Sequence, residues 1–236
     1  QLDALSANHL IGQAPDRIAT ALRRLRSLPA DTANAWGDYL AESHTVEFHV
    51  GATASLSDGL FHRLAGALTS RGVKILSAQI DTLADGLVLD RFVIVDPDFA
   101  GPPSARRINT IRRTLVDAAE RAQPPKFRHV WGEKDVARQH ELSSQQSQVR
   151  IDNSTSDRYT LIEICTFDSI GLLYRIARQI YALDLSVAVA KIGTYLDQVV
   201  DVFYVTDTDG QPVAGEDRLN IIRQKLLEVI ATPDHE

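Results

Sequence analysis

The sequence has no methionine and a single cysteine, Cys165, among its 236 residues. One cysteine excludes an internal disulfide framework of the kind that stabilises small secreted domains, and it favours a reducing compartment such as the cytoplasm. Position 1 is glutamine, and no secretory signal pattern is present. We therefore expect the chain to be part of a longer cytoplasmic protein.

Long apolar runs and an excess of positive charge are also missing. The longest hydrophobic runs have the length of a strand, so they offer no candidate for a membrane-spanning helix. The 25 Lys and Arg side chains are outnumbered by 31 Asp and Glu, which gives a net charge of −6, whereas binding to nucleic-acid phosphates depends on clustered Lys and Arg. The composition therefore argues against a membrane or nucleic-acid partner, and the length allows two domains.

One pattern occurs twice in the sequence. From Gly59 it runs GLFHRLAGALTSRGVKILSAQIDTLADGLVLDRFVIVD, and from Gly171 it runs GLLYRIARQIYALDLSVAVAKIGTYLDQVVDVFYVTD. The offset is 112 residues (171 − 59), and one extra residue near Gly86 lowers it to 111 for Asp90 and Asp201. A period of this length is typical of a duplicated small domain rather than of a solenoid unit.

The hydrophobic pattern predicts strand, helix, strand, strand, helix in each repeat. In the first strand, Val46, Phe48 and Val50 alternate with Glu47 and His49, which predicts one apolar face and one exposed, polar face. The other predicted elements of the first repeat are a helix at 59–71, strands at 73–82 and 87–95, and a helix at 104–121. Those of the second are a strand at 159–166, a helix at 171–183, strands at 186–195 and 199–206, and a helix at 217–230.

These elements predict an α+β fold with two ferredoxin-like βαββα repeats, because each sheet has one apolar face for two helices to cover. No strand follows the last helix, so each repeat should take an extra edge strand from its N-terminal side, at 36–40 and 148–152. The expected divisions are a helical connector (1–34), a first domain (35–121), a linker (122–146) and a second domain (147–236). The connector helix is too short to be stable alone, so it must dock on another surface.

The sequence specifies no catalytic or metal-binding constellation. Asp96 and Asp98, like Asp207 and Asp209, end strands where carboxylates hold divalent metals in nucleotidyl transfer. No phosphate-binding loop precedes either pair, so we interpret both as solvated turn residues. The histidines lack the helical spacing of zinc ligands, and no base is specified near Cys165.

One loop remains as a candidate ligand site, with the residues Asp168, Ser169, Ile170, Gly171 and Leu172. A strand ends and a helix begins here, so backbone N–H groups at the helix start are available to a carboxylate, and the glycine allows close approach. Asp168 is equally well explained as the helix N-cap. From the spacing alone, both interpretations stay open.

Three stretches are similar to a known family. They read IDNSTSDRYTLIEICTFDSIGLLYRIARQIYALDLSVAVAKIGTYLDQVVDVFYVTD, DGLVLDRFVIVD and APDRIATALRRL. They resemble the C-terminal tandem ACT domains, and the segment before them, of the bifunctional PII uridylyltransferase/uridylyl-removing enzymes. The resemblance implies a regulatory module that senses glutamine and controls the transfer of UMP to PII, and its removal, in nitrogen regulation. It also implies that the catalytic domains, with magnesium as their cofactor, lie upstream and that this part has neither a cofactor nor activity.

The resemblance also implies a binding loop. ACT domains typically bind an amino acid at a D-x-x-G-L loop, often between two modules, and Asp168, Gly171 and Leu172 match it. Ser169 and Ile170 replace the usual Arg-Pro. In the first repeat, Leu56 stands in the acid's place and the loop is three residues longer. The weaker second site there consists of Asp58, Gly59 and Leu60.

The partners implied by the resemblance are an amino acid (glutamine), the upstream catalytic domains, PII through the parent enzyme, and a second copy of the chain through its ACT domains. Three alternatives stay open. The chain is the ACT tail of another amino-acid-controlled enzyme or a stand-alone ACT-repeat protein, it is an RNA-binding module, or it is a purely structural dimerisation module. The RNA-binding alternative is disfavoured because its aromatic signature is missing and the net charge has the wrong sign.

Overall fold

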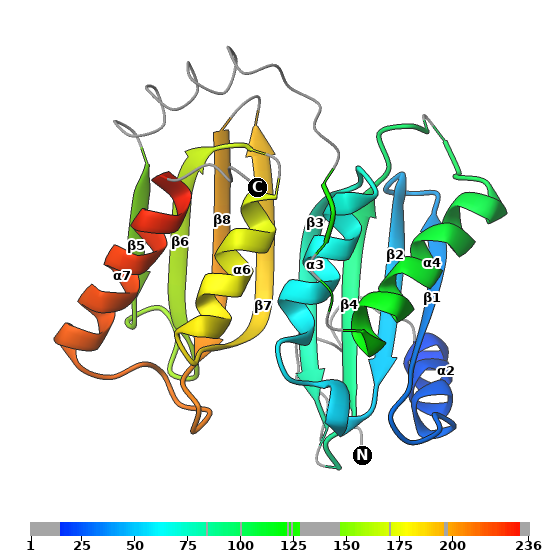
Figure 1. The fold of residues 1–236 in the computed structure, drawn as a ribbon, viewed down its shortest axis with the longest axis horizontal. Helices are drawn as coiled ribbons and strands as arrows, with labels where there is room; N and C mark the ends of the chain where they lie inside the picture. The colour runs from blue at the N-terminus through cyan, green and yellow to red at the C-terminus, as the bar shows by residue number, and fades with distance from the viewer. Residues whose placement is uncertain are drawn as a thin grey trace. The chain divides into compact units, whose positions relative to one another are not determined.

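Each repeat of the sequence folds into a four-stranded antiparallel sheet with two helices on one face, in the computed structural model of the chain (Figure 1). The repeats lie in two compact units, Gln1–Pro125 and Lys126–Glu236. The structure describes residues 15–83, 85–99, 101–121, 123, 125–127, 147–169, 171–195 and 198–231. Ile170 and most of the expected linker 122–146 lie outside the described residues.

The first unit has the strand order β1-β2-β4-β3, with every neighbouring pair antiparallel. Its elements after the helix α2 are β1 (Ala33–Leu40), β2 (Thr45–Ala52), the 3-10 turn η2 (Ala54–Leu56), α3 (Leu60–Ser70), β3 (Lys74–Thr82), β4 (Val88–Val95) and α4 (Ala105–Glu120). The alternation and the helical spacing of apolar residues predicted β2, α3, β3, β4 and α4 to within a few residues, and the turn η2 was not predicted.

The second unit has the equivalent strand order β5-β6-β8-β7. Its elements are β5 (Gln148–Asp152), β6 (Thr160–Phe167), α6 (Leu172–Ala182), β7 (Ser186–Tyr195), β8 (Gln198–Thr206) and α7 (Glu216–Ala231). The α+β fold class with two ferredoxin-like βαββα repeats is therefore confirmed.

The predicted N-terminal edge strands are confirmed as well. β1 pairs with β2 from Ala33 opposite Ala52 to Leu40 opposite Thr45, so it begins three residues before the expected start. β5 pairs with β6 from Gln148 opposite Cys165 to Asp152 opposite Leu161. These strands pair the backbone edges of β2 and β6, which would otherwise expose a row of unused N–H and C=O groups.

The main core of each unit lies between the sheet and its two helices. In the first unit, Phe48 and Phe92 are fully buried, and the Phe92 ring stacks on Phe61 of α3 with ring centroids 6.3 Å apart. The second unit fills the same layer with aliphatic side chains around Phe203, contributed by Ile162, Ile164, Ile176, Ile180, Ile222 and Leu226. Burying a side chain of this size stabilises a fold by about 1.5–3 kcal/mol, so this layer dominates the stability of both units.

The helix α2 (Pro15–Arg26) covers the other face of the first sheet. Its Ile18, Ala21 and Leu25 are buried against Leu89 of β4, and Trp36 of β1 packs at the edge of this cluster. The expectation that this helix must dock on a surface is met within its own unit. The apolar side chains recur with helical spacing, which gives α2 the single apolar face that docking requires.

The docking of α2 corrects the predicted exposed face of β2, because Glu47 and His49 are buried there. The Glu47 carboxylate accepts hydrogen bonds from His49 Nε2 at 3.0 Å and from Arg91 Nε at 2.6 Å, and it lies 3.5 Å from Arg17 Nη1 of α2. Burial raises the pKa of Glu47, but the hydrogen bond from His49 and the charge of Arg91 outweigh it and lower this pKa from 4.5 to about 2. This cluster was not predicted, because Arg17 and Arg91 come from elements far from β2 in the sequence.

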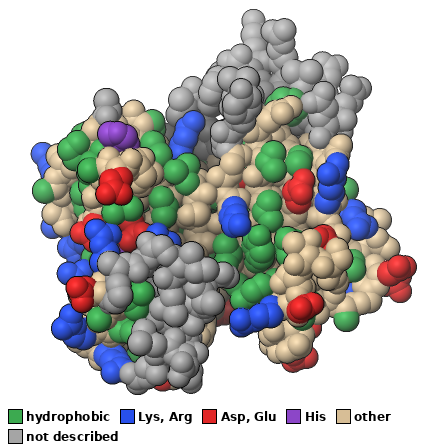
Figure 2. All heavy atoms as spheres, turned by 180° about the vertical axis from the view of Figure 1, so that it is seen from behind, with side chains coloured by type: hydrophobic (Ala, Val, Ile, Leu, Met, Phe, Trp, Pro, Cys, Tyr) green, Lys and Arg blue, Asp and Glu red, His purple; other side chains and the backbone are tan. Residues whose placement is uncertain are grey.

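The corresponding face of the second sheet shows hydrophobic and charged side chains at its surface. Val200 is 47 % exposed, and Lys191 Nζ lies 5.2 Å from the centre of the Tyr204 ring. In Figure 2, which shows the molecule from behind, hydrophobic and basic side chains lie together on this face. Cation–π contacts at exposed sites contribute about 0.5–1 kcal/mol, so this face adds little to the stability of the second unit.

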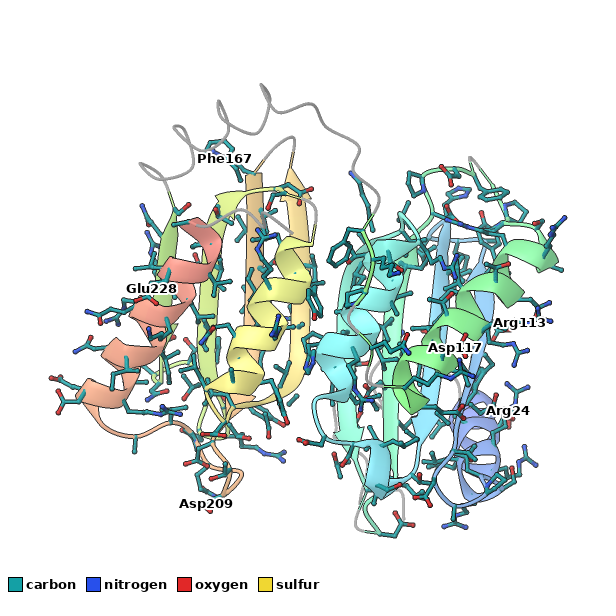
Figure 3. All side chains as sticks on the ribbon, viewed as in Figure 1. Arg24, Arg113, Asp117, Phe167, Asp209 and Glu228 are labelled. Carbon is teal, nitrogen blue, oxygen red and sulfur yellow. The ribbon has the colours of Figure 1, made fainter. Side chains whose placement is uncertain are left out.

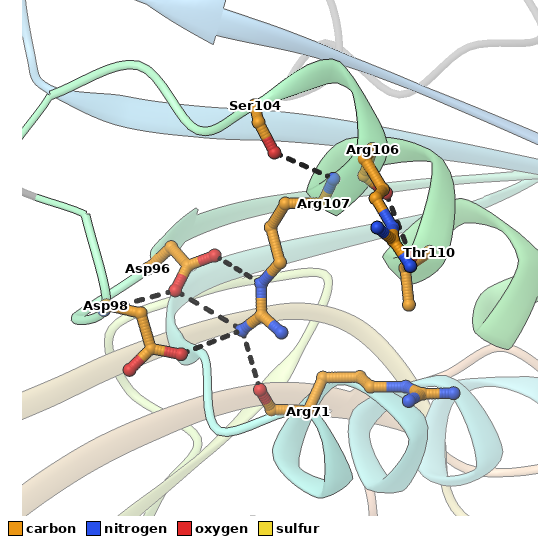
Figure 4. A network of polar contacts seen from close by, with 7 residues as sticks. All are labelled: Arg71, Asp96, Asp98, Ser104, Arg106, Arg107 and Thr110. Atoms are coloured by element: carbon orange, nitrogen blue, oxygen red, sulfur yellow. Dashed lines mark hydrogen bonds and ion pairs between the residues drawn. The ribbon is translucent and has the colours of Figure 1, made fainter.

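An arginine joins the two helices of the first unit at one end (Figure 4). Arg107 of α4 donates to both carboxylate oxygens of Asp96, at 2.7 and 3.3 Å, and to the Arg71 carbonyl at the end of α3 at 2.8 Å. Asp96 is only 4 % exposed, so its interpretation as a solvated turn residue was wrong. In the second unit, Arg218 of α7 likewise donates to the Leu183 carbonyl at the end of α6.

None of the helices that the structure describes combines the length and the apolar character that crossing a membrane requires.

Candidate functional site

The β6–α6 loop follows Phe167, which Figure 3 labels at the end of β6. Asp168 is exposed, Ser169 is half-buried, and Gly171 and Leu172 are buried. Gly171 has φ = 73°, in the left-handed region where a residue with a Cβ is strained. Of the five predicted ligand-binding residues, the structure thus places four in one loop at the start of α6, and Ile170 lies outside the described residues.

The N-cap of α6 is Gly171, which has no side chain with which to cap the helix. The alternative interpretation of Asp168 as the N-cap was therefore wrong. The Leu172 N–H donates to the Ser169 carbonyl at 3.1 Å, and the Arg175 N–H donates to the Gly171 carbonyl at 2.9 Å. Because the N-cap is glycine, it supplies no side-chain acceptor to the backbone N–H groups of the first turn of α6, which lie at the positive end of the helix dipole.

Two further side chains shape this loop. The guanidinium of Arg175 donates to Ser169 Oγ at 2.9 Å. Phe127, in the predicted linker, lies over the loop, and its ring is 5.7 Å from the ring of Tyr174. A Cβ at position 171 would lie 3.0 Å from the Phe127 ring. A substitution of Gly171 would thus disturb local packing as well as ligand approach.

The equivalent loop of the first repeat is fastened by hydrogen bonds. Gly59 has φ = 60° and is the N-cap of α3, while Asp58 is exposed and Leu60 is buried. Arg63, the counterpart of Arg175, donates to the Leu56 carbonyl at 2.6 Å, to the Asp58 carbonyl at 2.9 Å and to the Ala119 carbonyl of α4 at 2.8 Å. The extra residues of this loop form the turn η2. The weaker predicted site, Asp58, Gly59 and Leu60, is thus tied to α4.

Two buried aspartates, which sequence reasoning did not identify as site residues, lie at equivalent positions of the sheets. Asp90 of β4 is 0 % exposed and Asp201 of β8 is 1 % exposed. Burial raises the pKa of Asp90 well above its usual value, and the nearby Asp81 raises it further. Burial also raises the pKa of Asp201, to about 8. The hydrogen bond from the Gly193 N–H lowers this pKa, and the charge of Asp168 raises it.

The strand pattern contained a signal for these aspartates. Asp90 alternates with Val88 and Phe92, and Asp201 with Val199 and Phe203, on faces that are otherwise apolar. A carboxyl group at such a position is costly to bury unless it is hydrogen-bonded or paired with an opposite charge. The sequence therefore marked both residues as anomalies on the helix-covered face.

The other chemistry-bearing residues are accounted for by structural roles. Asp207 accepts hydrogen bonds from the N–H groups of Asp209 and Gln211, within the turn labelled by Asp209 at the opposite end of the unit from Phe167 (Figure 3). Burial raises the pKa of the Cys165 thiol, as does its hydrogen bond to Glu163, so the thiolate is disfavoured. In the described ranges, no three or more His, Cys, Asp or Glu side chains gather where they could hold a metal ion.

A hollow on the surface of α4 is lined by Arg112, Arg113, Val116 and Asp117. Figure 3 labels Arg113 and Asp117 on this helix. All four residues belong to a single helix, and only exposed or half-buried side chains line the hollow. It lacks the convergent buried polar groups of a ligand site, so the loops at the starts of α3 and α6 remain the candidates.

Comparison with known proteins agrees with the resemblance. Residues 148–234 match the family model described as an ACR9-like, ACT-like domain. The chain is 34% identical over 176 residues to the bifunctional uridylyltransferase/uridylyl-removing enzyme of Azospirillum brasilense, covering 74% of this chain and 19% of that protein. It is 34% identical over 171 residues to the enzyme of the same name from Novosphingobium aromaticivorans, covering 72% and 18%.

The chain thus spans about a fifth of the length of the curated relatives it matches. The match includes an ACT-like domain, which agrees with the C-terminal ACT region expected from the sequence. Residues 148–234 thus match an ACT-like domain, and about three quarters of the chain is similar to part of the bifunctional uridylyltransferase/uridylyl-removing enzymes.

Proposed function

We propose that this chain is the glutamine-sensing regulatory module of a bifunctional uridylyltransferase/uridylyl-removing enzyme. The proposal rests on the start of α6, where the glycine N-cap supplies no side-chain acceptor to the first-turn N–H groups. Such a helix end favours an anionic group, and every α-amino acid has one in its carboxylate. Glutamine is the amino acid that the resemblance to the PII uridylyltransferase/uridylyl-removing enzymes implies.

In this proposal the chain regulates chemistry that takes place elsewhere. Upstream domains, with magnesium as their cofactor, transfer UMP to PII and remove it, and glutamine bound at the β6–α6 loop shifts the balance between these activities. A ligand shifts such a balance only through different affinities for the two states of the enzyme. We therefore expect the loop to bind glutamine with different affinities in the transferring and removing states of the parent enzyme.

The experiment that tests the proposal is calorimetric titration of this chain with each of the common amino acids. We expect glutamine to bind, and glutamate and asparagine to bind more weakly. If another amino acid binds in its place, the chain is the tail of a differently regulated enzyme. Absence of binding by any amino acid would favour a purely structural dimerisation module.

A second assay tests the assignment of catalysis to the absent domains. The purified chain, incubated with PII, UTP and magnesium, should transfer no UMP, because no catalytic constellation was found in its sequence. The full-length parent enzyme is the positive control. Transfer by the isolated chain would refute its role as a regulatory module alone.

A further inference from the structure

The Asp201 carboxyl group lies near the loop end of β8, on the face covered by α6 and α7. Its neighbours along this face of β8 are Val199 and Phe203, and across the sheet it pairs with Ile164 of β6 and Ile192 of β7. The Gly193 N–H provides one hydrogen bond to the carboxyl group. Among the described residues, Oδ1 of Asp201 has no hydrogen-bond partner.

Packing does not explain this carboxyl group. A buried oxygen without a partner destabilises the folded state, and an apolar side chain of similar size would avoid that cost. The first repeat has the same feature, since neither carboxyl oxygen of Asp90 has a partner within the described part of the chain. Two copies of one anomaly beneath equivalent loops indicate a function inherited from the duplicated module.

Asp201 lies near the end of the sheet at which the β6–α6 loop begins. Its strand partner Ile164 precedes the last residue of β6 by three positions, which places Asp201 about 7–10 Å below the end of the strand. Asp168 of the loop is close enough for its charge to act on the Asp201 carboxyl group. The loop thus has N–H donors at the start of α6 and, beneath them, an acceptor whose Oδ1 is unused.

We propose that Asp201 is a ligand-binding residue whose carboxylate accepts hydrogen bonds from the α-ammonium group of an amino acid bound at the β6–α6 loop. The ligand's own carboxylate lies on the N–H groups at the start of α6. This inference rests on the proposed function and adds the residue that recognises the cationic end of the ligand. A zwitterion suits such a site because its two charges meet groups of opposite polarity.

The protonation of Asp201 adds a pH dependence to binding. With a pKa of about 8, raised by burial, the carboxyl group is mainly neutral at pH 7 in the absence of ligand. An ammonium group favours the carboxylate, so binding releases a proton and affinity should rise with pH up to about 8. The other ionisable groups around the site are Asp168 in the loop and Tyr174 and Arg175 on α6, while Glu163, Cys165 and Lys191 lie on the opposite face of the sheet.

Asp90 provides the matched control. It occupies the same position in the first repeat, but the loop above it is fastened by the hydrogen bonds of Arg63 to the Leu56 and Asp58 carbonyls. We therefore expect Asp201, and not Asp90, to govern affinity. Asp90→Asn and Asp201→Asn make the same chemical change at the two sites.

The test is calorimetric titration of the wild-type chain and both variants with glutamine and with glutaramate, which is glutamine without its α-ammonium group. The wild type should bind glutamine at least about tenfold more tightly than glutaramate. Asp201→Asn should weaken glutamine binding at least about tenfold and remove the difference between the two probes, because a charge-assisted bond is lost. Asp90→Asn should leave both affinities within about twofold of the wild type. Unchanged glutamine binding by a folded Asp201→Asn protein would overturn the inference.

The comparison of the two probes on the wild type needs no variant, so it tests recognition of the α-ammonium group even if Asp201→Asn fails to fold. Equal binding of glutamine and glutaramate would overturn the role of Asp201 while leaving the proposed function intact. If a different amino acid binds and loses its affinity in Asp201→Asn, the role of Asp201 stands and glutamine is the wrong ligand. Absence of binding by every amino acid at millimolar concentration would overturn both.

Discussion

At equivalent positions of the two repeats, Leu89 is fully buried and Val200 is 47 % exposed. The difference comes from α2, which covers the back of the first sheet, while in the second sheet the same face carries exposed side chains. The layers between sheets and helices, by contrast, match closely, with Phe92 and Phe203 both at 0 % exposure. Duplication has thus preserved the main core and left the opposite face of each sheet free to diverge.

The loops at the starts of α3 and α6 also differ between the repeats, in the hydrogen bonds that hold them. Arg63 joins the loop of the first repeat to α4, whereas its counterpart Arg175 donates to Ser169 within the loop of the second repeat. The first repeat is therefore built as a firmly packed scaffold. The loop of the second repeat, which Arg175 contacts through Ser169 and over which the Phe127 ring lies, is the one that we propose binds the ligand.

The largest difference in stability between the repeats should come from substituting the glutamates on the sheet faces opposite the two-helix layers. Glu47→Ala should lower the free energy of unfolding of the first unit by about 3–5 kcal/mol, because Arg91 and His49 would lose their buried partner. Glu163→Ala is the matched control, since this glutamate is half-exposed and lies 3.9 Å from the exposed Arg150. It should cost less than about 1 kcal/mol. Denaturant unfolding measures both, and equal losses would contradict the difference between the faces.

A second pair of variants tests the apolar contact with α2. Leu89→Ala should destabilise the first unit by about 2–5 kcal/mol, because it leaves a cavity under the helix. Val200→Ala removes a half-exposed side chain and should change stability by about 0.5 kcal/mol. Melting temperatures from circular dichroism would check this, and a Val200→Ala loss as large as that of Leu89→Ala would indicate that another surface covers the second sheet.

These differences also show which features of the fold could be predicted from the sequence and which could not. Alternation and helical spacing located the strands and helices to within a few residues, because such patterns record which face of an element is buried. His49 was expected on an exposed face and is buried, since its burial depends on where α2 docks. Asp96 was expected in a solvated turn, but its partner Arg107 lies on the helix that follows. Contacts between separate elements leave little trace in local periodicity.

The candidate site was predictable in part. The position of Gly171 between a strand and a helix identified the loop, and the structure finds it at the N-cap with positive φ. The contact of Phe127 with Gly171 could not be foreseen, because 44 residues (171 − 127) separate the two in the chain. Asp201 could have been found from its alternation with Val199 and Phe203.

Glu47 of the first repeat and Asp201 of the second should make pH-dependent contributions to stability of opposite sign. The pKa of Glu47 is lowered to about 2, so the stability it contributes is complete above pH 4.5 and is lost as the pH falls toward 2. The pKa of Asp201 is raised to about 8, so its contribution is complete below its unfolded value, near 4, and is lost as the pH rises toward 8. Each group contributes a slope of about 1.4 kcal/mol per pH unit inside its window.

The free energy of unfolding, measured across these pH ranges, checks the direction of each change in stability. Glu47→Gln should flatten the acid side of the stability profile, and Asp201→Asn should flatten the decline between about pH 4 and pH 8. A decline that is unchanged in Asp201→Asn would mean that another group titrates there.

The smallest expected difference concerns the aspartates after the last strand of each repeat. Asp96→Ala should cost about 1.5–3 kcal/mol, because Arg107 loses a buried carboxylate that it contacts through two nitrogens. Asp207→Ala removes hydrogen bonds to two N–H groups of an exposed turn and should cost about 1 kcal/mol. Thermal unfolding of the two variants would measure the difference, and a larger loss for Asp207→Ala would contradict it.

The central claim is that the second repeat, and not the first, binds the amino acid. Two-dimensional NMR of the backbone N–H groups during titration with glutamine tests it most directly, because both loops are observed in one experiment. We predict saturable shifts of the backbone N–H signals of Gly171, Leu172 and Asp201, while those of Gly59 and Leu60 stay unchanged. Shifts confined to Gly59 and Leu60, or shifts of equal size at both loops, would contradict it.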